Sequence, residues 1–189
     1  KNAKAIIVIR NPKAIVASMK NVKDKAISAG EVIPEFTKSV SNSISFIEKY
    51  WKEGLKAYKN YGNRIHLVSY EELILEPKKE LESIGGFLNI EFEGGMTSPG
   101  ESSFNRGNEK ENIWYTDKDH KRNIDTKSLH KWEQILSTKE AKEIDDKLNT
   151  LHNIWLHNGV MKEEDELNYV FEATNKTRSK IVSFLQKKE

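Results

Sequence analysis

An arginine and a serine eight residues apart, Arg10 and Ser18, have the types and spacing to bind an anion. Arg10 directly follows an apolar run, and Pro12 is typical of the first turn of a helix. A guanidinium fixed at the end of a strand, with a hydroxyl about two helical turns further on, carries the donors that hold a phosphate group. An arginine after a strand also commonly forms a surface salt bridge, so both interpretations are open at this point.

Two apolar runs predict the strands that would position these residues. Ile6–Ile9 predicts a short strand buried on both faces, as in a parallel sheet, and Arg64–Ser69 predicts a second buried strand. Between them, apolar residues recur at three- and four-residue steps over 36–58 and predict one long amphipathic helix that Gly62 ends. Two strands separated by a long helix favour a right-handed parallel βαβ unit. Arg10 would then lie at the carboxyl end of a strand, where open α/β sheets bind ligands.

The rest of the chain predicts further helices and two loops. A polar loop is expected over residues 23–35, and Pro77 opens a short helix after the second strand. Residues 93–127 are polar and rich in glycine, asparagine and serine, and a loop of this length in a compact domain is usually functional or disordered. Ser137–Glu140 has the spacing of a capping box and predicts the start of a helix that Gly159 ends.

The composition fits a globular domain. The chain has 189 residues, of which 37% are hydrophobic and 32% are charged, and its formal net charge is +2. A charge this small does not argue for nucleic acid or an anionic membrane as a partner. The chain has no cysteine, which excludes disulfides, thiolate catalysis and thiolate metal sites, and no apolar run approaches the ~20 residues that cross a bilayer. The absence of cysteine favours a reducing compartment or a bacterial protein, and we expect a cytoplasmic location.

The segment around Arg10 resembles the 3′-phosphate-binding segment of sulfotransferases that use PAPS (3′-phosphoadenosine-5′-phosphosulfate). In that family a strand ends in Arg-Asn-Pro or Arg-Asp-Pro, and a helical serine follows eight residues after the arginine. Arg10-Asn11-Pro12 and Ser18 match in type and spacing. The resemblance implies an α/β fold with a P-loop-kinase-like parallel sheet flanked by helices. It also implies that Arg10 and Ser18 hold the 3′-phosphate of the cofactor.

Two further segments resemble the part of the family site that surrounds the adenine. Tyr70-Glu71-Glu72-Leu73 is similar to a Tyr-Glu-Asp-Leu segment whose tyrosine lies near the base, and Ser102-Ser103-Phe104 is similar to a triplet that contacts it. The resemblance implies that Tyr70, Ser102 and Phe104 frame the adenine, with Phe104 stacking on it. Tyr70 as an aromatic cap of the sheet edge is an open alternative. We expect Glu71 to bind backbone or a neighbouring cation rather than substrate.

A third segment resembles the other side of the cofactor site. Leu129-His130-Lys131-Trp132 is similar to the Leu-Ser-Lys-Trp of tyrosylprotein sulfotransferases, whose lysine contacts the cofactor's phosphate. Those enzymes place a cofactor-binding serine fifteen residues before that lysine, and Thr116 occupies the matching position here. The resemblance therefore implies that Lys131 and Thr116 bind the cofactor, whereas we expect Trp132 to belong to the core.

The chain departs from the family in two places. Residues 125–127 are Asp-Thr-Lys, where cytosolic small-molecule sulfotransferases have an Arg-Lys-Gly that binds the 3′-phosphate. The family's glycine-containing phosphosulfate loop has no counterpart in these residues. We expect this loop and the catalytic His or Glu base upstream of Lys1, so the catalytic residues stay unassigned. The chain would then be the C-terminal portion of the fold, without its N-terminal part.

The resemblance implies a transferase that moves a sulfuryl group from PAPS to an acceptor hydroxyl or amine by in-line displacement. The product would be 3′,5′-adenosine bisphosphate, and the acceptor a small molecule, a carbohydrate or a peptide. We expect no metal, because the five histidines lack metal-binding spacing, and no nucleic-acid partner. A non-catalytic nucleotide-binding or interaction module of the same fold and a P-loop nucleotide kinase are the alternatives.

The domain organisation follows from the same patterns. We expect the C-terminal portion of a sulfotransferase domain over residues 1–160 and a helical extension over 161–189, whose apolar residues fall on one face. The extension would pack on its own domain, with packing on a second copy in a homodimer as the alternative.

Overall fold

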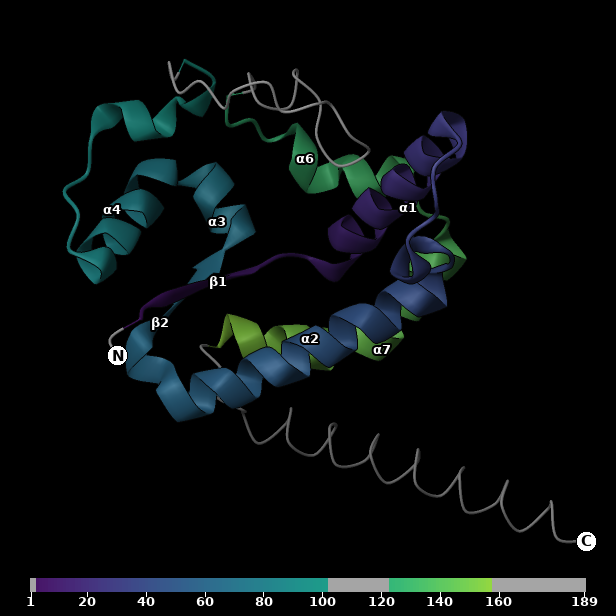
Figure 1. Cartoon of the computed structure of the whole chain (residues 1–189), viewed down its shortest axis with the longest axis horizontal. Helices are drawn as coiled ribbons and strands as arrows, with labels where there is room; N and C mark the ends of the chain where they lie inside the picture. Colours follow the sequence, from purple (N-terminus) through teal and green to yellow (C-terminus); the bar gives the residue numbers. More distant parts are fainter. Residues whose placement is uncertain (1–2, 102–122, 158–189) are drawn as a thin grey trace, which may run out of the picture.

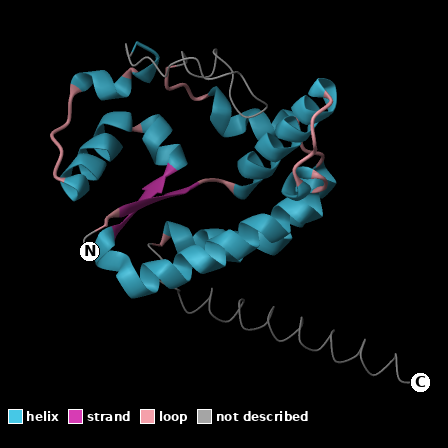
Figure 2. Ribbon diagram, in the orientation of Figure 1, coloured by secondary structure: helices cyan, strands magenta, loops and turns pink. Residues whose placement is uncertain are grey.

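A parallel two-stranded sheet lies at the centre of the molecule (Figures 1 and 2). The computed structural model describes residues 3–101 and 123–157. Strand β1 (Ala5–Ile9) pairs with β2 (Ile65–Ser69) in a register that sets Ile7 beside Leu67 and Ile9 beside Ser69. The predicted parallel pairing of two strands across a long helix is confirmed. It brings the carboxyl ends of both strands to one edge of the sheet.

Helix α1 (Pro12–Ala29) follows β1 directly. Its start is fixed locally, because the Asn11 side chain accepts a hydrogen bond of 2.9 Å from the N–H of Lys13. The prediction of a polar loop over 23–35 is wrong in its first half, since the helix continues to Ala29. Buried side chains in its last turns, packed with Ile33, explain the extra length. Gly30 ends the helix at φ 67°, which suits glycine.

Helix α2 (Val40–Tyr61) is the long amphipathic helix that the sequence predicts, although it starts later than expected. A short 3₁₀ helix, η1 (Glu35–Thr37), precedes it, and the Ser39 side chain caps its first turn. Gly62 does not end α2 in a left-handed conformation. The backbone instead tightens into η2 (Gly62–Arg64), which leads into β2.

The remaining helices surround the sheet. The opening of a helix at Pro77 is confirmed. The elements are α3 (Tyr70–Leu75), α4 (Pro77–Leu88), η3 (Gly94–Thr97), η4 (Pro99–Glu101), α6 (Lys127–His130), η5 (Lys131–Gln134) and α7 (Thr138–Leu156). Helices α2 and α7 run along one side of the sheet, and α3 and α4 lie on the other (Figure 1).

The main hydrophobic core lies between the sheet, α1, α2 and α7. Ile144 and Leu148 of α7 are completely buried there. Helices α2 and α7 approach closely at Gly54, where an added Cβ would lie 3.0 Å from the Trp155 ring.

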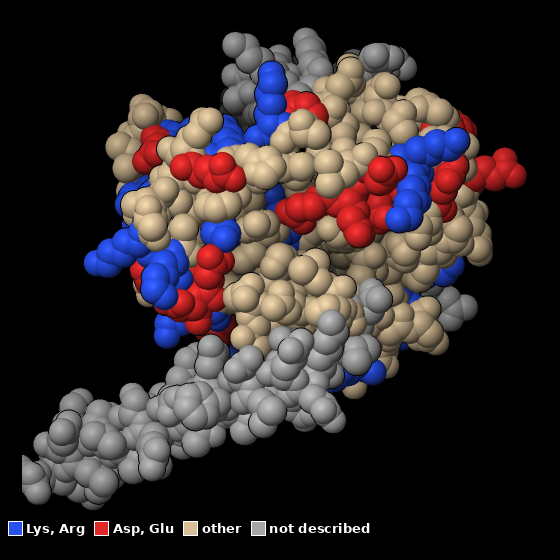
Figure 3. All heavy atoms as spheres, turned by 180° about the vertical axis from the view of Figure 1, so that it is seen from behind, with Lys and Arg blue, Asp and Glu red and all other residues tan. Residues whose placement is uncertain are grey.

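Around this core, lysines and arginines are interspersed with acidic side chains over the face shown in Figure 3. No helix within the described residues is long and apolar enough to span a membrane.

The strands are where the sequence predicts them, but the expected burial of β1 on both faces is wrong. Ile9 faces the core and is 4% exposed, whereas Ile6 and Val8 on the opposite face are 39% and 52% exposed. That face of the sheet is covered over β2, where His66 stacks on Phe87 of α4. Because α3 and α4 contact β2, the β1 half of this face stays open.

Helix α7 begins with the predicted capping box. The Ser137 side chain accepts a hydrogen bond from the N–H of Glu140, and the Glu140 carboxylate accepts one of 2.8 Å from the N–H of Ser137. Lys20 of α1 forms an ion pair of 2.7 Å with the same carboxylate. The hydrogen bond with Lys20, followed by that with the Ser137 backbone, lowers the pKa of Glu140 from 4.5 to about 2.

We expect Glu140→Gln to lower the free energy of unfolding at pH 7 by about 1 kcal/mol, because the ion pair with Lys20 is lost and the cap is weakened. A carboxylate whose pKa is lowered on folding stabilises the protein above its unfolded pKa, near 4.5, and this contribution fades as the pH falls towards 2. Urea unfolding of both proteins between pH 7 and 3 should therefore show the difference shrinking below pH 4.5.

Glu143→Gln, on the same helix, is the matched control and should change stability by less than about 0.5 kcal/mol. A difference between Glu140→Gln and the parent protein that stays constant from pH 7 to 3 would contradict the assigned role of the carboxylate.

Candidate functional site

The Arg10 side chain lies at the carboxyl edge of the sheet, immediately after β1. Its guanidinium carbon is 4.2 Å from the centre of the Tyr70 ring, within the range of a cation–π contact. Its Nη2 donates a hydrogen bond of 3.2 Å to the backbone carbonyl of Ser128 in α6. The guanidinium is therefore held between the start of α3 and the segment that carries α6.

Tyr70 completes this arrangement from the other strand. It is the first residue of α3, directly after β2, and its hydroxyl donates a hydrogen bond of 3.1 Å to Oγ of Ser128. Arg10 and Tyr70, both predicted as cofactor-binding residues, thus lie in contact, and Ser128 touches both. Sequence analysis missed Ser128. In the sequence, Ser128 is marked only by its position just before the Leu129–Trp132 segment, and this position does not indicate which residues it contacts.

Glu71 fixes the turn that carries Arg10. Its Oε1 accepts a hydrogen bond of 2.9 Å from the backbone N–H of Asn11, whose side chain caps α1. The expectation that Glu71 binds backbone is confirmed. The carboxylate thereby links the end of β1 to the start of α3, which fixes the positions of Arg10 and Tyr70 relative to each other.

Arg10 keeps donors to offer an anion. A guanidinium carries five N–H donors, and within the described residues only the Ser128 carbonyl is placed to accept from it. Its Nε is buried and has no hydrogen-bond partner among those residues. A buried N–H without an acceptor is uncommon in folded proteins, and a phosphate oxygen would supply the acceptor. The residues at this edge therefore fit an anionic ligand.

A small hollow of about 200 Å³ adjoins the Arg10 contact. Its walls combine apolar side chains with a few polar groups, and its lining comprises Tyr70, Ile74, Pro99, Asn123, Ile124, Asp125 and Ser128. The N–H of Gly100 donates a hydrogen bond of 2.9 Å to the Asn123 side chain and joins the two chain segments that form one wall. Pockets for drug-sized ligands have volumes of about 300–1,000 Å³. This hollow suits one ring system better than a whole nucleotide.

The other predicted site residues are not joined to Arg10 in the described parts of the chain. Ser18 is exposed on α1, and Lys131 is exposed at the start of η5. No hydrogen bond links either side chain to Arg10 within residues 3–101 and 123–157. Ser102, Phe104 and Thr116 lie outside the described residues, as does residue 159, the expected end of α7.

The expectation that Trp132 belongs to the core is confirmed, since it packs against the main core cluster. Lys13 of α1 lies over its ring with Nζ 4.6 Å from the centre, and the same Nζ forms an ion pair of 3.0 Å with Asp145 of α7. These contacts engage the Lys13 charge within the protein. Arg10 is therefore better placed than Lys13 to bind an external anion.

His152 of α7 is stacked on Trp51, with ring centres 5.5 Å apart. Burial lowers the pKa of His152 below its usual 6.5, and the charge of Lys13 acts in the same direction, while Glu71 and Asp145 oppose it. The lowered pKa favours the neutral form of this imidazole at neutral pH. No group of three or more His, Cys, Asp or Glu side chains within the described residues is placed to hold a metal ion.

Comparison with known proteins identifies the family. The sequence profile described as "Sulfotransferase domain" matches residues 1–154. This chain belongs to the sulfotransferase domain family. Its fold is the expected α/β arrangement with a P-loop-kinase-like parallel sheet flanked by helices, and both predictions, of family and of fold class, are confirmed.

A solved structure described as "Sulfotransferase Domain from the Curacin Biosynthetic Pathway" has a similar fold, with a TM-score of 0.55. It is 21% identical in sequence, and the match covers 78% of this chain and 54% of that one. The sulfotransferase domain described here thus spans about half the length of that neighbour. No curated protein matches the sequence significantly.

The contact between Tyr70 and Ser128 can be measured with a double-mutant cycle. We expect Tyr70→Phe and Ser128→Ala to be coupled by about 0.5–1.5 kcal/mol in urea unfolding, because each removes one partner of the same half-buried hydrogen bond. Tyr70→Phe combined with Ser83→Ala, in α4, is the control pair and should be additive. Additivity of the Tyr70 and Ser128 changes would contradict the contact.

Proposed function

We propose that this sulfotransferase domain binds PAPS and takes part in transferring its sulfuryl group to an acceptor hydroxyl or amine. The observation that carries the proposal is the Arg10 guanidinium, which is held at the carboxyl edge of the sheet by Tyr70 and Ser128 and retains a buried Nε without a partner in the described residues. Family membership supports a sulfuryl transfer as the reaction.

In this proposal Arg10 binds the 3′-phosphate through its guanidinium fork, since two parallel N–H donors match two phosphate oxygens. Ser18, exposed on α1, and Lys131, exposed on η5, would add a hydroxyl and an ammonium to the same phosphate site. Tyr70 and the hollow beside it would receive the adenine, together with Ser102 and Phe104. Thr116 would add a further polar contact to the cofactor.

When bound, PAPS supplies a sulfuryl group that an acceptor oxygen or nitrogen attacks in line with the departing phosphate. The residues of this chain act on the part of the cofactor that does not react. Arg10 neutralises the charge of the 3′-phosphate and fixes the position of the nucleotide. Binding energy from such a remote group orients the reacting group, which raises the rate of transfer as well as the affinity.

A titration with nucleotides tests this proposal. We expect the protein to bind 3′,5′-adenosine bisphosphate more tightly than 5′-AMP, measured by calorimetry at a fixed salt concentration. Arg10→Ala should weaken binding of the bisphosphate by about 1.5–3 kcal/mol, or roughly 10- to 150-fold, because a charge-assisted contact is lost. Its effect on 5′-AMP should be much smaller.

Arg64→Ala is the matched control, because Arg64 lies before β2 at the opposite end of the sheet and stacks on Tyr61. It should leave both affinities unchanged. Equal affinity for the two nucleotides, or an Arg10→Ala variant that is folded by circular dichroism and binds the bisphosphate normally, would overturn the proposal. A nucleotide kinase would show no preference for the 3′-phosphate.

A further inference from the structure

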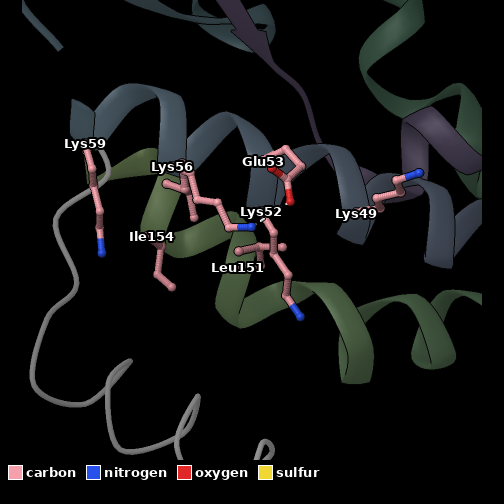
Figure 4. Close-up of a pocket in the computed structure, with 8 residues that line it drawn as sticks. Lys49, Lys52, Glu53, Lys56, Lys59, Leu151 and Ile154 are labelled. Atoms are coloured by element: carbon pink, nitrogen blue, oxygen red, sulfur yellow. Dashed lines mark hydrogen bonds and ion pairs between the residues drawn. The ribbon is translucent and has the colours of Figure 1, made fainter. Parts of the chain in front are cut away.

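A groove of about 490 Å³ runs between α2 and α7, away from the Arg10 site (Figure 4). Basic side chains form its rim and apolar side chains its floor, and its lining comprises Lys49, Lys52, Glu53, Leu55, Lys56, Lys59, Leu151 and Ile154. We call it the lysine groove. The lysine groove plays no part in the proposed cofactor site.

The four lysines of the lysine groove follow one face of α2. Their positions, 49, 52, 56 and 59, are separated by three, four and three residues, which is the spacing of neighbours on one side of a helix. The row extends over about 15 Å. Figure 4 shows Leu151 and Ile154 of α7 next to Lys52, Lys56 and Lys59 of this row, whereas Lys49 points away from them. Lysine side chains can lay their aliphatic stems on such a floor and keep their ammonium groups at the rim.

The charges at the rim leave the lysine groove positive. Lys52 pairs with Glu48 and Lys56 with Glu53, each at 2.7 Å. Both pairs join residues on the same helix, and such pairs at the surface contribute only about 0.3–0.5 kcal/mol, so they exchange readily with other carboxylates. Four lysines and one glutamate line the groove. The matching ligand is an acidic segment with an apolar face.

The sequence that follows α7 contains such a segment. Residues 163–172 carry five acidic side chains and no basic one, and Leu167, Val170 and Phe171 are spaced at three- and four-residue steps within them. Residues 173–188 have the opposite character, with five basic side chains and no acidic one. The lysine groove would attract the first of these stretches and repel the second.

The end of α7 places this acidic segment within reach. Helix α7 ends at Leu156, so Leu151 and Ile154, which line the lysine groove, belong to its last turns. Five residues, 158–162, lie between His157 and Glu163, and the six Cα-to-Cα steps from one to the other span up to about 20 Å when extended. The ten residues 163–172 would match the length of the lysine row if helical. A tethered segment also has an effective concentration in the millimolar range, so a modest intrinsic affinity suffices.

We propose that residues 163–172 dock in the lysine groove of the same molecule. Their carboxylates would pair with the lysine row. Their apolar side chains would lie against Leu55 and the aliphatic stems of the lysines, because Leu151 and Ile154 are already buried in the core, at 3% and 1% exposed. The C-terminal extension would thereby be anchored on its own domain rather than on a second copy.

Cysteine pairs test this docking directly, because the full chain has no cysteine of its own. Lys56→Cys is combined in turn with a cysteine at each acidic position of 163–172, and disulfide formation is followed under mild oxidation. Disulfides need Cα atoms about 4.4–6.8 Å apart. We expect at least one pair to close within the monomer about tenfold faster than the control pairs, a ratio that corresponds to about 1.4 kcal/mol.

The control pairs are Lys25→Cys, on α1 outside the groove, with the same tail cysteines, and Lys56→Cys with Ser183→Cys in the basic stretch. The advantage of the acidic positions should shrink in 1 M salt, where charges are screened beyond about 3 Å. Equal rates for test and control pairs would overturn the proposal. Predominantly intermolecular disulfides would overturn it too, since a second copy would then occupy the groove.

Charge reversal gives an independent readout. In the double variant Lys52→Glu/Lys59→Glu we expect the backbone amides of residues 163–172 to exchange hydrogen about tenfold faster than in the parent protein, because the docked state is less populated. Lys25→Glu/Lys78→Glu, with both changes outside the lysine groove, should leave exchange unchanged. Identical exchange of the segment in the parent protein and the groove variant would contradict the docking.

Discussion

The structure of the site depends on the parallel pairing of β1 with β2. Ile9 lies beside Ser69 in the register, so the residues that follow them, Arg10 and Tyr70, emerge at the same edge of the sheet. The contact continues one residue further, where the Glu71 carboxylate accepts from the Asn11 N–H across 60 positions of sequence. An antiparallel pairing would send these two turns to opposite ends of the sheet. The contacts that Arg10 makes therefore depend on the parallel direction of the two strands.

Helices α6 and α7 add contacts that hold Arg10 and Tyr70 in place at the edge of the sheet. Ser128 of α6 accepts from Arg10 and from Tyr70, and it closes the contact between the ends of the two strands. Helix α7 is joined to α1 by the ion pairs Lys20–Glu140 and Lys13–Asp145, so the helix that follows Arg10 is attached to α7 at two points along its length. Residues more than a hundred positions apart in the sequence therefore determine how freely the guanidinium moves.

Most secondary structure could be predicted because its signals are local. Strong periodicity marks α2, a proline at the first helical position marks α4, and the Ser137–Glu140 capping box marks α7. The failures concern properties that depend on the whole fold. The length of α1 depends on burial of Val22 and Ala26, and the exposure of Val8 depends on which helices cover which strand.

The same distinction applies to the site. Two sequence signals indicated the family: the spacing of Arg10 and Ser18, and the Tyr70 segment. They also indicated Arg10 and Tyr70 as site residues, and the fold brings these two into contact. The role of Ser128 could not be predicted, since it acts through a backbone carbonyl as well as its side chain, and every residue has such a carbonyl. The roles of Ser18 and Lys131 stay predictions. The structure shows Ser18 exposed on α1 and Lys131 exposed on η5.

The open face of β1 has a consequence for the behaviour of the chain in solution. Ala5–Ile9 is an uncharged run of β-prone residues whose Ile6 and Val8 side chains meet solvent, and such a strand is a hazard for sheet-to-sheet aggregation. Lys4 and Arg10 flank the run on either side. In an in-register parallel stack of two copies these cations would face their own kind, which disfavours the stack. Arg10, at the end of β1, would then disfavour self-association of the strand as well as bind an anion.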